Sequence, residues 1–384
     1  MSGVVEDIRR VYAEEEGRQA MAEHLTDVPH NYMRLTPQWF TELLCRDVPG
    51  AEVTGLTLAE ASNGSSNRQR ILLRYNAAGD RAGLPPSVFC KASQSLLNRI
   101  MLGSSGTAKG ETDFFTKVRP VLEIEAPTPL HAAFDDHTRA YIIVMKDMTG
   151  EADFLNEQSP VSRADAEGMV RVLATLHGSY FADPALGTAA LPFHHWSDWW
   201  DNQMAVSPTF ATKCVRAMDE CEQIVPARLF ARRNEIWPLT NRSAELHRDL
   251  PRTLIHSDVH LGNWYRRDGH MGLCDWQITT TGHWSRDLIY ALSTSLSVED
   301  RRNWFDDLLR AYIDAMAERG VTDIRFEDAH RQCRQQLMST LAFWTITLRP
   351  TDDMPLMQPE GITRALITRI AAAIDDMDAL DAFD

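Results

Sequence analysis

Lysine is scarce in this chain of 384 residues. The sequence carries 39 basic residues against 54 acidic ones, a formal net charge of −15, and all but five of the basic residues are arginine. Proteins that bind nucleic acid usually present a basic face, so this composition argues against a nucleic-acid partner. The five lysines are Lys91, Lys109, Lys117, Lys146 and Lys213. Chemistry that requires an ammonium group therefore has few candidates.

Paired cysteine motifs and long apolar runs are also missing. None of the six cysteines forms a C-x-x-C pair, which disfavours a zinc ribbon or a thioredoxin-like site, and a reducing cytoplasm is the simplest setting. No apolar run reaches the roughly 18–20 residues of a membrane helix. Residues 1–21 mix acids and bases without an apolar core, so no secretory signal is expected. We predict a cytoplasmic protein without a membrane partner.

The first part of the chain is rich in strand-like segments. A helical extension, 1–35, precedes a helix that Thr36 can cap and Pro37 can begin. Strand-like runs at 52–59, 69–75 and 87–92 are separated by turn-forming stretches at 63–67 and 76–86, which predicts an antiparallel meander. A helix around 110–118 and a further strand at 139–146 follow.

After Gly150 the pattern becomes helical. Ser162 can cap a helix that runs to about His177, and further helices are expected at 211–248, 299–319, 326–348 and 360–380. One β-rich island, 253–278, interrupts them. The length allows one or two domains. We predict an α+β fold with a small antiparallel β-rich N-lobe, 36–148, and a larger, mainly helical C-lobe, 149–384.

The island carries a cluster of polar residues between apolar runs. His256, Asp258 and Asn263 form an H-x-D-x-x-x-x-N pattern, and Asp275 ends the next apolar run. Phosphoryl transfer to a hydroxyl needs a carboxylate that orients the hydroxyl and accepts its proton. It also needs oxygen ligands for Mg²⁺ and a cation at the nucleotide phosphates. The island therefore favours a phosphotransferase active site.

The remaining parts of a kinase site occur earlier in the chain and in the expected order. Lys91 ends the run Val88-Phe89-Cys90-Lys91, which matches the V-A-I-K pattern of a kinase strand, and Glu111 lies at the start of the predicted helix that follows. A strand lysine paired with a helix glutamate is the kinase solution for holding the phosphates. The combination is far more specific than the catalytic-loop pattern alone.

Residues 36–350 resemble the aminoglycoside-phosphotransferase and choline-kinase superfamily of protein-kinase-like folds, and within it the ecdysteroid-kinase-like (CHK kinase-like) group. The pattern HGDxHxGN of these proteins reads His256-Ser257-Asp258-Val259-His260-Leu261-Gly262-Asn263 here, with Ser257 in place of glycine. Asp275-Trp276-Gln277 stands where protein kinases have D-F-G. The segment Trp284–Tyr290 resembles the RDLAY-like segment of the group. The expected glycine-rich loop is reduced to Asn63-Gly64-Ser65-Ser66-Asn67.

The resemblance implies a role for each matching residue. Asp258 would be the catalytic base. His256 is the second catalytic candidate, although a histidine in such a loop is more often structural than a proton carrier. Asn263 and Asp275 would bind Mg²⁺, and Asp287 would brace the catalytic loop. Lys91 would contact the nucleotide phosphates and pair with Glu111. The phosphate turn would be formed by Asn63, Gly64, Ser65 and Ser66, and the adenine hinge by Val144, Met145, Lys146, Asp147 and Met148.

Residues that would meet the acceptor are less sharply indicated. Trp196, Trp199 and Trp200 suit either a helix start packed in the core or an apolar wall for a bulky acceptor. The same two interpretations apply to Trp344. His260 and Gln277 lie within the motifs and are further acceptor candidates. A zinc site of His256, Asp258 and His260 is disfavoured, since no further ligands follow at zinc spacing.

These features predict an ATP- and Mg²⁺-dependent phosphotransferase acting on a hydroxyl of a small organic molecule. A bulky or apolar alcohol, such as a steroid-like, terpenoid or hydroxyacyl compound, is the preferred acceptor. An aminoglycoside or other antibiotic is the alternative within the same class. A nucleotide-binding module of the pseudokinase type is the alternative of another class, disfavoured because Lys91, Asp258 and Asp275 are all present. The choice of ATP over GTP and the oligomeric state stay open.

Overall fold

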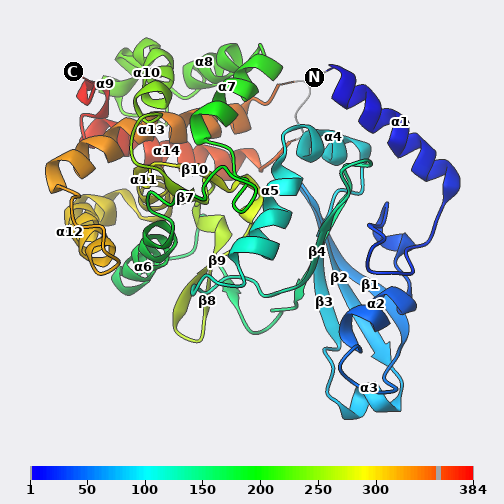
Figure 1. Ribbon diagram of the computed structural model, residues 1–384. Helices are drawn as coiled ribbons and strands as arrows, with labels where there is room; N and C mark the ends of the chain where they lie inside the picture. Colours follow the sequence, from blue (N-terminus) through cyan, green and yellow to red (C-terminus); the bar gives the residue numbers. More distant parts are fainter. Residues whose placement is uncertain (1, 352–355, 384) are drawn as a thin grey trace. The chain divides into compact units, whose positions relative to one another are not determined.

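The computed structural model describes residues 2–351 and 356–383, which divide into two compact units (Figure 1). The first unit comprises Met1–Pro120 with Pro127–Glu151, and the second comprises Val121–Ala126 with Ala152–Asp384. Residues 1–35 thus belong to the first unit. The first unit contains a five-stranded antiparallel sheet and the second is mainly helical, which confirms the predicted fold class. Within the described ranges, no helix is long and apolar enough to cross a membrane.

The sheet of the first unit has the strand order β1-β2-β3-β5-β4. Its strands are β1 (Val53–Asn63), β2 (Asn67–Tyr75), β3 (Ser87–Ala92), β4 (Pro129–Phe134) and β5 (Tyr141–Lys146). The predicted meander corresponds to β1, β2 and β3. Strand β4 was not predicted, because its residues at the edge of the sheet are all half-buried and therefore show no alternation. Because β1 and β2 pair up to Asn63 and Asn67, the predicted phosphate turn is a tight hairpin.

One face of this sheet carries the core of the first unit. Helix α2 (Pro37–Leu44) begins after Thr36, whose Oγ1 accepts a hydrogen bond from the N–H of Trp39 at 3.2 Å. Trp39 packs in one core cluster with Val88 and Cys90, which lie two residues apart on the same face of β3. Lys91 directly follows Cys90, so its side chain belongs to the opposite face.

Of the other helices described in the first unit, the first lies within the predicted helical extension, the last begins earlier than predicted, and the two between them were not predicted. They are α1 (Ser2–Arg18), α3 (Ala77–Arg81), α4 (Leu96–Ser104) and α5 (Thr107–Asp113), which continues as a π-helical turn over Phe114–Val118. Gly106, with a left-handed φ of 77°, separates α4 from α5 and sets the start of α5. Glu111 therefore lies in the second turn of its helix, and the prediction that it opens the helix is wrong.

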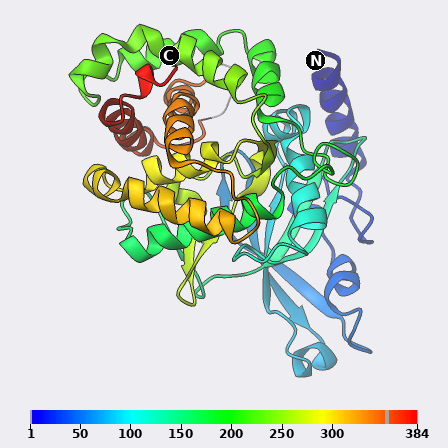
Figure 2. The ribbon, with the colours of Figure 1, turned by 60° about the vertical axis from the view of Figure 1, so that its left-hand side comes forward.

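The second unit is built on packed helices, with α13 next to α8, α10, α11 and α14, and α6 next to α12 (Figures 1 and 2). Its helices are α6 (Arg163–Ser179), α7 (Trp196–Val206), α8 (Phe210–Asp219), α9 (Ala227–Ala231), α10 (Arg233–Leu246), α11 (Ser285–Ser295), α12 (Val298–Ala317), α13 (Phe326–Leu348) and α14 (Glu360–Asp376). Ser162 caps α6 as predicted. The single helix predicted over 211–248 is three helices, because Pro226 and its neighbours break the helical path.

Short strands hold the polar island of the second unit. β7 (Thr253–Ile255) pairs with β10 (Thr280–Gly282), and β8 (Trp264–Arg267) pairs with β9 (His270–Leu273) and β6 (Asp153–Phe154). The segment from His256 to Asn263 connects β7 to β8. It is therefore supported by rigid strands at both ends, as loops that hold functional groups commonly are.

Candidate active site

The loop after β7 is held by a buried carboxylate. Asp287, in the first turn of α11, is 0% exposed. Its Oδ2 accepts the N–H of His256 at 2.6 Å, and its Oδ1 accepts the N–H of Ser257 at 2.9 Å. His177 Nε2 lies 3.3 Å from Oδ2. Burial alone would raise the pKa of Asp287, but the hydrogen bond with His177 and the backbone donors lower it on balance. Asp287 thus braces the loop as an anion.

Ser257 occupies the one strained position of this loop. Its φ is 70°, in the left-handed region where glycine is favoured, and the HGDxHxGN pattern that this loop resembles has glycine at this position. The hydroxyl of Ser257 is paired with Thr280 Oγ1 at 2.6 Å, and its carbonyl accepts a hydrogen bond from Arg286 at 3.1 Å. These contacts offset the backbone strain, so Ser257 holds the left-handed conformation that glycine would adopt more easily.

His256 connects the loop to the end of β9. Its Nδ1 accepts the N–H of Asp258 at 3.2 Å, and its Nε2 donates to the carbonyl of Cys274 at 3.0 Å. Burial lowers the pKa of His256, so the neutral ring suits these two bonds. With both ring nitrogens engaged, His256 acts as a positioning residue rather than as a proton carrier. The same engagement argues against His256 as a zinc ligand.

Two neighbouring side chains hold Asp258, one at its carboxylate and one at its backbone carbonyl. Its Oδ1 accepts a hydrogen bond from the hydroxyl of Tyr290 at 3.0 Å, and Asn263 donates through Nδ2 to the carbonyl of Asp258 at 2.7 Å. The side chain of Asp258 is 18% exposed, which leaves part of it accessible. Burial and the charge of Asp258 raise the pKa of Tyr290, so its hydroxyl stays protonated as a donor.

Tyr290 is a site residue that the sequence reasoning missed. It lies three residues after Asp287, one turn further along α11. A single helix face thus supplies both the brace of the loop backbone and the donor to the Asp258 carboxylate. The sequence feature that could have identified Tyr290 is the spacing within the Trp284–Tyr290 segment, because an aspartate and a tyrosine three residues apart lie on the same face of a helix.

Asn263 and Asp275 are the candidate oxygen donors for a metal ion. The N–H of Cys274 donates to the carbonyl of Asn263 at 2.9 Å, so the paired strands β8 and β9 bring the two candidate ligands to the same end of the hairpin. The amide nitrogen of Asn263 donates to the carbonyl of Asp258, so Oδ1 of Asn263 is the atom that could bind a metal ion. In the described parts of the chain, no group of three or more His, Cys, Asp or Glu side chains could hold a metal ion. Two hard oxygen donors, completed by phosphate and water, fit Mg²⁺.

A buried ion pair lies in the first unit. Lys91 Nζ on β3 is 2.7 Å from Oε1 of Glu111 on α5, and the side chains are 4% and 1% exposed. The expected pair is therefore present. If Lys91 moved away from Glu111, each would be left as an uncompensated buried charge. The ion pair therefore constrains the position of the ammonium group strongly.

The predicted hinge and phosphate turn are also in the first unit. Asp147 accepts hydrogen bonds from Arg70 Nε and Ser87 Oγ, both at 2.6 Å. Burial alone would raise the pKa of Asp147, but hydrogen bonds from these two residues and from Thr149 lower it on balance. The N–H of Lys146 is taken by a sheet-edge carbonyl, Thr128, at 3.0 Å. Adenine contacts by Met145, Lys146, Asp147 and Met148 stay a prediction. In the turn, Gly64 and Ser65 are half-buried, Ser66 is buried, and the side chain of Asn63 lies outside the described part.

The acceptor candidates divide into two groups. Trp196 and Trp200 are each 2% exposed and belong to a core cluster, and the ring of Trp199 stacks on Phe343 at 5.8 Å, which supports the core interpretation of this segment. His260 instead has its Nε2 3.9 Å from Asp258 Oδ2. Trp344 packs edge-on against His260 at 5.3 Å, whereas Gln277 is 8% exposed.

Comparison with known proteins defines the family. A family model described as the phosphotransferase enzyme family matches residues 95–321, more than half of the chain, and the chain belongs to this family. The match includes Asp258, Asn263, Asp275 and Asp287, whereas Lys91 and the turn at 63–67 precede it. No curated protein matches the chain.

Solved structures with a similar fold are distant in sequence. An ethanolamine kinase of Plasmodium vivax is 11% identical, with 85% of this chain and 83% of that chain covered and a TM-score of 0.48. A GDP complex of an aminoglycoside 2'-phosphotransferase-IIIa variant is 12% identical, with 88% and 96% covered and a TM-score of 0.47. A choline kinase of Streptococcus pneumoniae is 15% identical, with 84% and 94% covered and a TM-score of 0.44.

The brace formed by Asp287 predicts a pH-dependent loss of stability in Asp287→Asn. Because the folded-state pKa is lowered, the carboxylate stabilises the fold above its ordinary pKa of about 3.9, and this stabilisation is lost as pH falls through the folded value. We expect the variant to lose roughly 3 kcal/mol of unfolding free energy at pH 7. The difference from the unmodified protein should shrink below about pH 4.

Urea unfolding at pH 7 and at acid pH measures this difference. Asp314→Asn, at an exposed position of α12, is the matched control and should change stability by less than about 0.5 kcal/mol. An Asp287→Asn variant as stable as this control at pH 7 would contradict the brace.

Proposed function

We propose that this phosphotransferase transfers the γ-phosphoryl group of ATP to a hydroxyl of a small organic molecule, with Mg²⁺ as the metal. The observation that carries the proposal is the partly exposed carboxylate of Asp258 in a loop whose backbone is held by Asp287. Such a loop can present a carboxylate in one orientation without the cost of ordering it when substrate binds.

Asp258 would orient the acceptor hydroxyl and take its proton. As the bond between the hydroxyl oxygen and the γ-phosphorus forms, the bond from phosphorus to the bridging oxygen of ADP breaks, and the proton passes to the carboxylate. The transition state is loose, so the proton moves late and positioning contributes most of the catalysis. The hydrogen bond from Tyr290 limits rotation of the carboxylate and thereby fixes the direction from which it meets the hydroxyl.

Asn263 and Asp275 would hold the metal, and Lys91 would hold the α- and β-phosphates. Bound Mg²⁺ neutralises phosphate charge and orients the phosphates. Glu111 holds the Lys91 ammonium group in place through the buried ion pair. The chain keeps Lys91 in the first unit and Asp258 and Asp275 in the second, which favours an enzyme over a pseudokinase-type binding module.

The acceptor is proposed to be a neutral alcohol with apolar surface. The rings of Tyr290 and His260 lie beside Asp258, and Trp344 packs on His260, so aromatic groups surround the base. Aromatic rings bind apolar faces of ligands well. We also propose, from its motifs, that the chain is a member of the ecdysteroid-kinase-like group. An aminoglycoside acceptor is the alternative, for which the net charge of −15 is the supporting feature.

A panel of alcohols should distinguish these acceptors. We expect steroid and terpenoid alcohols to stimulate ADP release from MgATP at least tenfold over the rate without acceptor, and aminoglycosides to give no stimulation. Measuring ADP release in parallel for both groups, with the corresponding ketones as controls that lack the hydroxyl, tests this. Stimulation by aminoglycosides alone would contradict the apolar acceptor and leave the phosphotransferase assignment intact.

Asp258→Asn should lower kcat by a factor of about 10² to 10⁴ while MgATP binding changes little, because the amide cannot accept the proton. Tyr290→Phe keeps the carboxylate and removes one hydrogen bond to it, so a smaller loss of roughly tenfold is expected. Turnover with the best alcohol of the panel, together with calorimetric titration of MgATP, measures both effects. Near-normal turnover in Asp258→Asn would refute the role of this residue.

Asp275→Ala should remove the metal-dependent part of nucleotide binding. In the unmodified protein, adding Mg²⁺ is expected to increase the thermal shift produced by ATP, since the metal links the phosphates to Asn263 and Asp275. In the variant, ATP should give the same shift with Mg²⁺ as with EDTA. Asp268→Ala, at an exposed position between β8 and β9, is the control and should retain the Mg²⁺ dependence.

A further inference from the structure

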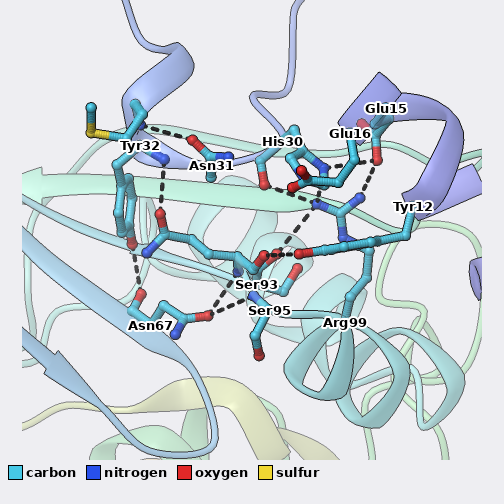
Figure 3. A network of polar contacts seen from close by, with 12 residues as sticks. Tyr12, Glu15, Glu16, His30, Asn31, Tyr32, Asn67, Ser93, Ser95 and Arg99 are labelled. Atoms are coloured by element: carbon cyan, nitrogen blue, oxygen red, sulfur yellow. Dashed lines mark hydrogen bonds and ion pairs between the residues drawn. The ribbon is translucent and has the colours of Figure 1, made fainter. Parts of the chain in front are cut away.

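The N-terminal segment is joined to helix α4 through a buried arginine. Arg99 on α4 is 0% exposed. Its guanidinium pairs with the carboxylate of Glu15 on α1 and donates to the carbonyls of His30 at 3.0 Å and Ser93 at 3.3 Å (Figure 3). His30 also contacts Glu16 of α1, with Nε2 2.5 Å from the carboxylate. Residues 1–35 are thus attached to the start of α4 by charge-assisted contacts.

The same network reaches the end of the predicted phosphate turn. Tyr32 donates its hydroxyl hydrogen to the carbonyl of Asn67 at 2.6 Å, and Asn67 Oδ1 accepts the N–H of Gln94 at 2.7 Å (Figure 3). Gln94 in turn accepts the N–H of Tyr32 at 2.9 Å. Asn67 is the first residue of β2. The exit of the turn is therefore fixed both to the N-terminal segment and to the residues that follow the Lys91 strand.

The tip of the turn is held by the residue next to Arg99. Asn98 is 7% exposed, and its Nδ2 donates to the carbonyls of Gly64 at 2.8 Å and Ser65 at 2.7 Å. The backbone N–H of Asn98 is capped by Ser95 Oγ at 3.1 Å, which fixes Asn98 in the first turn of α4. Two hydrogen bonds from one buried amide define the path of a turn that has a single glycine.

We propose that Asn98 is a positioning residue for nucleotide binding, which holds the turn at 63–67 in its phosphate-binding conformation, and that residues 1–35 support it through Arg99 and Asn67. This inference rests on the proposed function, since it takes the turn as part of the ATP site. A glycine-rich loop must be ordered when it closes on phosphates, whereas a turn that is already tied to a helix pays less conformational entropy on binding.

Asn98→Asp is the most direct test, because aspartate has nearly the same shape but cannot donate to the two carbonyls when ionised. We expect the Kd of MgATP, measured by calorimetric titration, to rise about tenfold, as loss of one to two net hydrogen bonds implies. KM for MgATP should rise by a similar factor with kcat nearly unchanged. Leu97→Ala, at an exposed neighbouring position of α4, is the matched control and should bind normally.

Tyr32→Phe tests the contribution of the N-terminal segment and remains informative if Asn98→Asp does not fold. It removes the hydrogen bond to the Asn67 carbonyl and should weaken MgATP binding about threefold. A merely structural role would lower the melting temperature of these variants without changing Kd at a temperature where they are folded. Normal MgATP affinity in folded Asn98→Asp and Tyr32→Phe would overturn the proposal.

Lys91→Ala separates this inference from the proposed function. If Lys91→Ala weakens MgATP binding and Asn98→Asp does not, the turn is not positioned by Asn98 and the nucleotide site stands. If neither Lys91→Ala nor any turn variant affects MgATP binding, the ATP site itself is wrong.

Discussion

The buried carboxylate of Asp287 is the constraint on which the candidate catalytic centre depends. It accepts the backbone N–H groups of His256 and Ser257 and is itself held by His177. A buried charge is stable only when hydrogen-bond donors surround it. The loop therefore stabilises the carboxylate of Asp287, and the carboxylate fixes the backbone of the loop. The left-handed conformation of Ser257 follows from this bond pair, because two successive N–H groups must point to one carboxylate.

Because Asp287 lies on a helix, its position is coupled to that of the candidate catalytic base, Asp258. One turn of α11 separates it from Tyr290, which donates to Asp258. The backbone of the loop and the orientation of its carboxylate are therefore set by the same rigid element. In the first unit, β3 has a comparable role: its alternation places Val88 and Cys90 in the core and Lys91 on the other face, toward Glu111.

Much of the fold was predictable because it follows local periodicity and capping. Helix α2 with its Thr36 cap, α6 with Ser162 and the meander of β1 to β3 belong to this group. The edge strand β4 was not predicted, because a strand that is half-buried along its whole length has no alternating pattern. The start of α5 was misplaced, since the left-handed Gly106 that sets it has no unique signature in sequence.

For the candidate site, the sequence by itself determined which residues could perform the chemistry: Asp258, Asn263 and Asp275 in one motif set, and a single strand lysine, Lys91, ahead of an acid. Tertiary structure alone decided how they are held. It assigned both nitrogens of His256 to hydrogen bonds, buried Trp196 and Trp200 in the core, and brought Tyr290 to Asp258. Motifs report residue types at fixed spacings, whereas hydrogen-bond partners and burial depend on segments far apart in the chain, which only packing brings together.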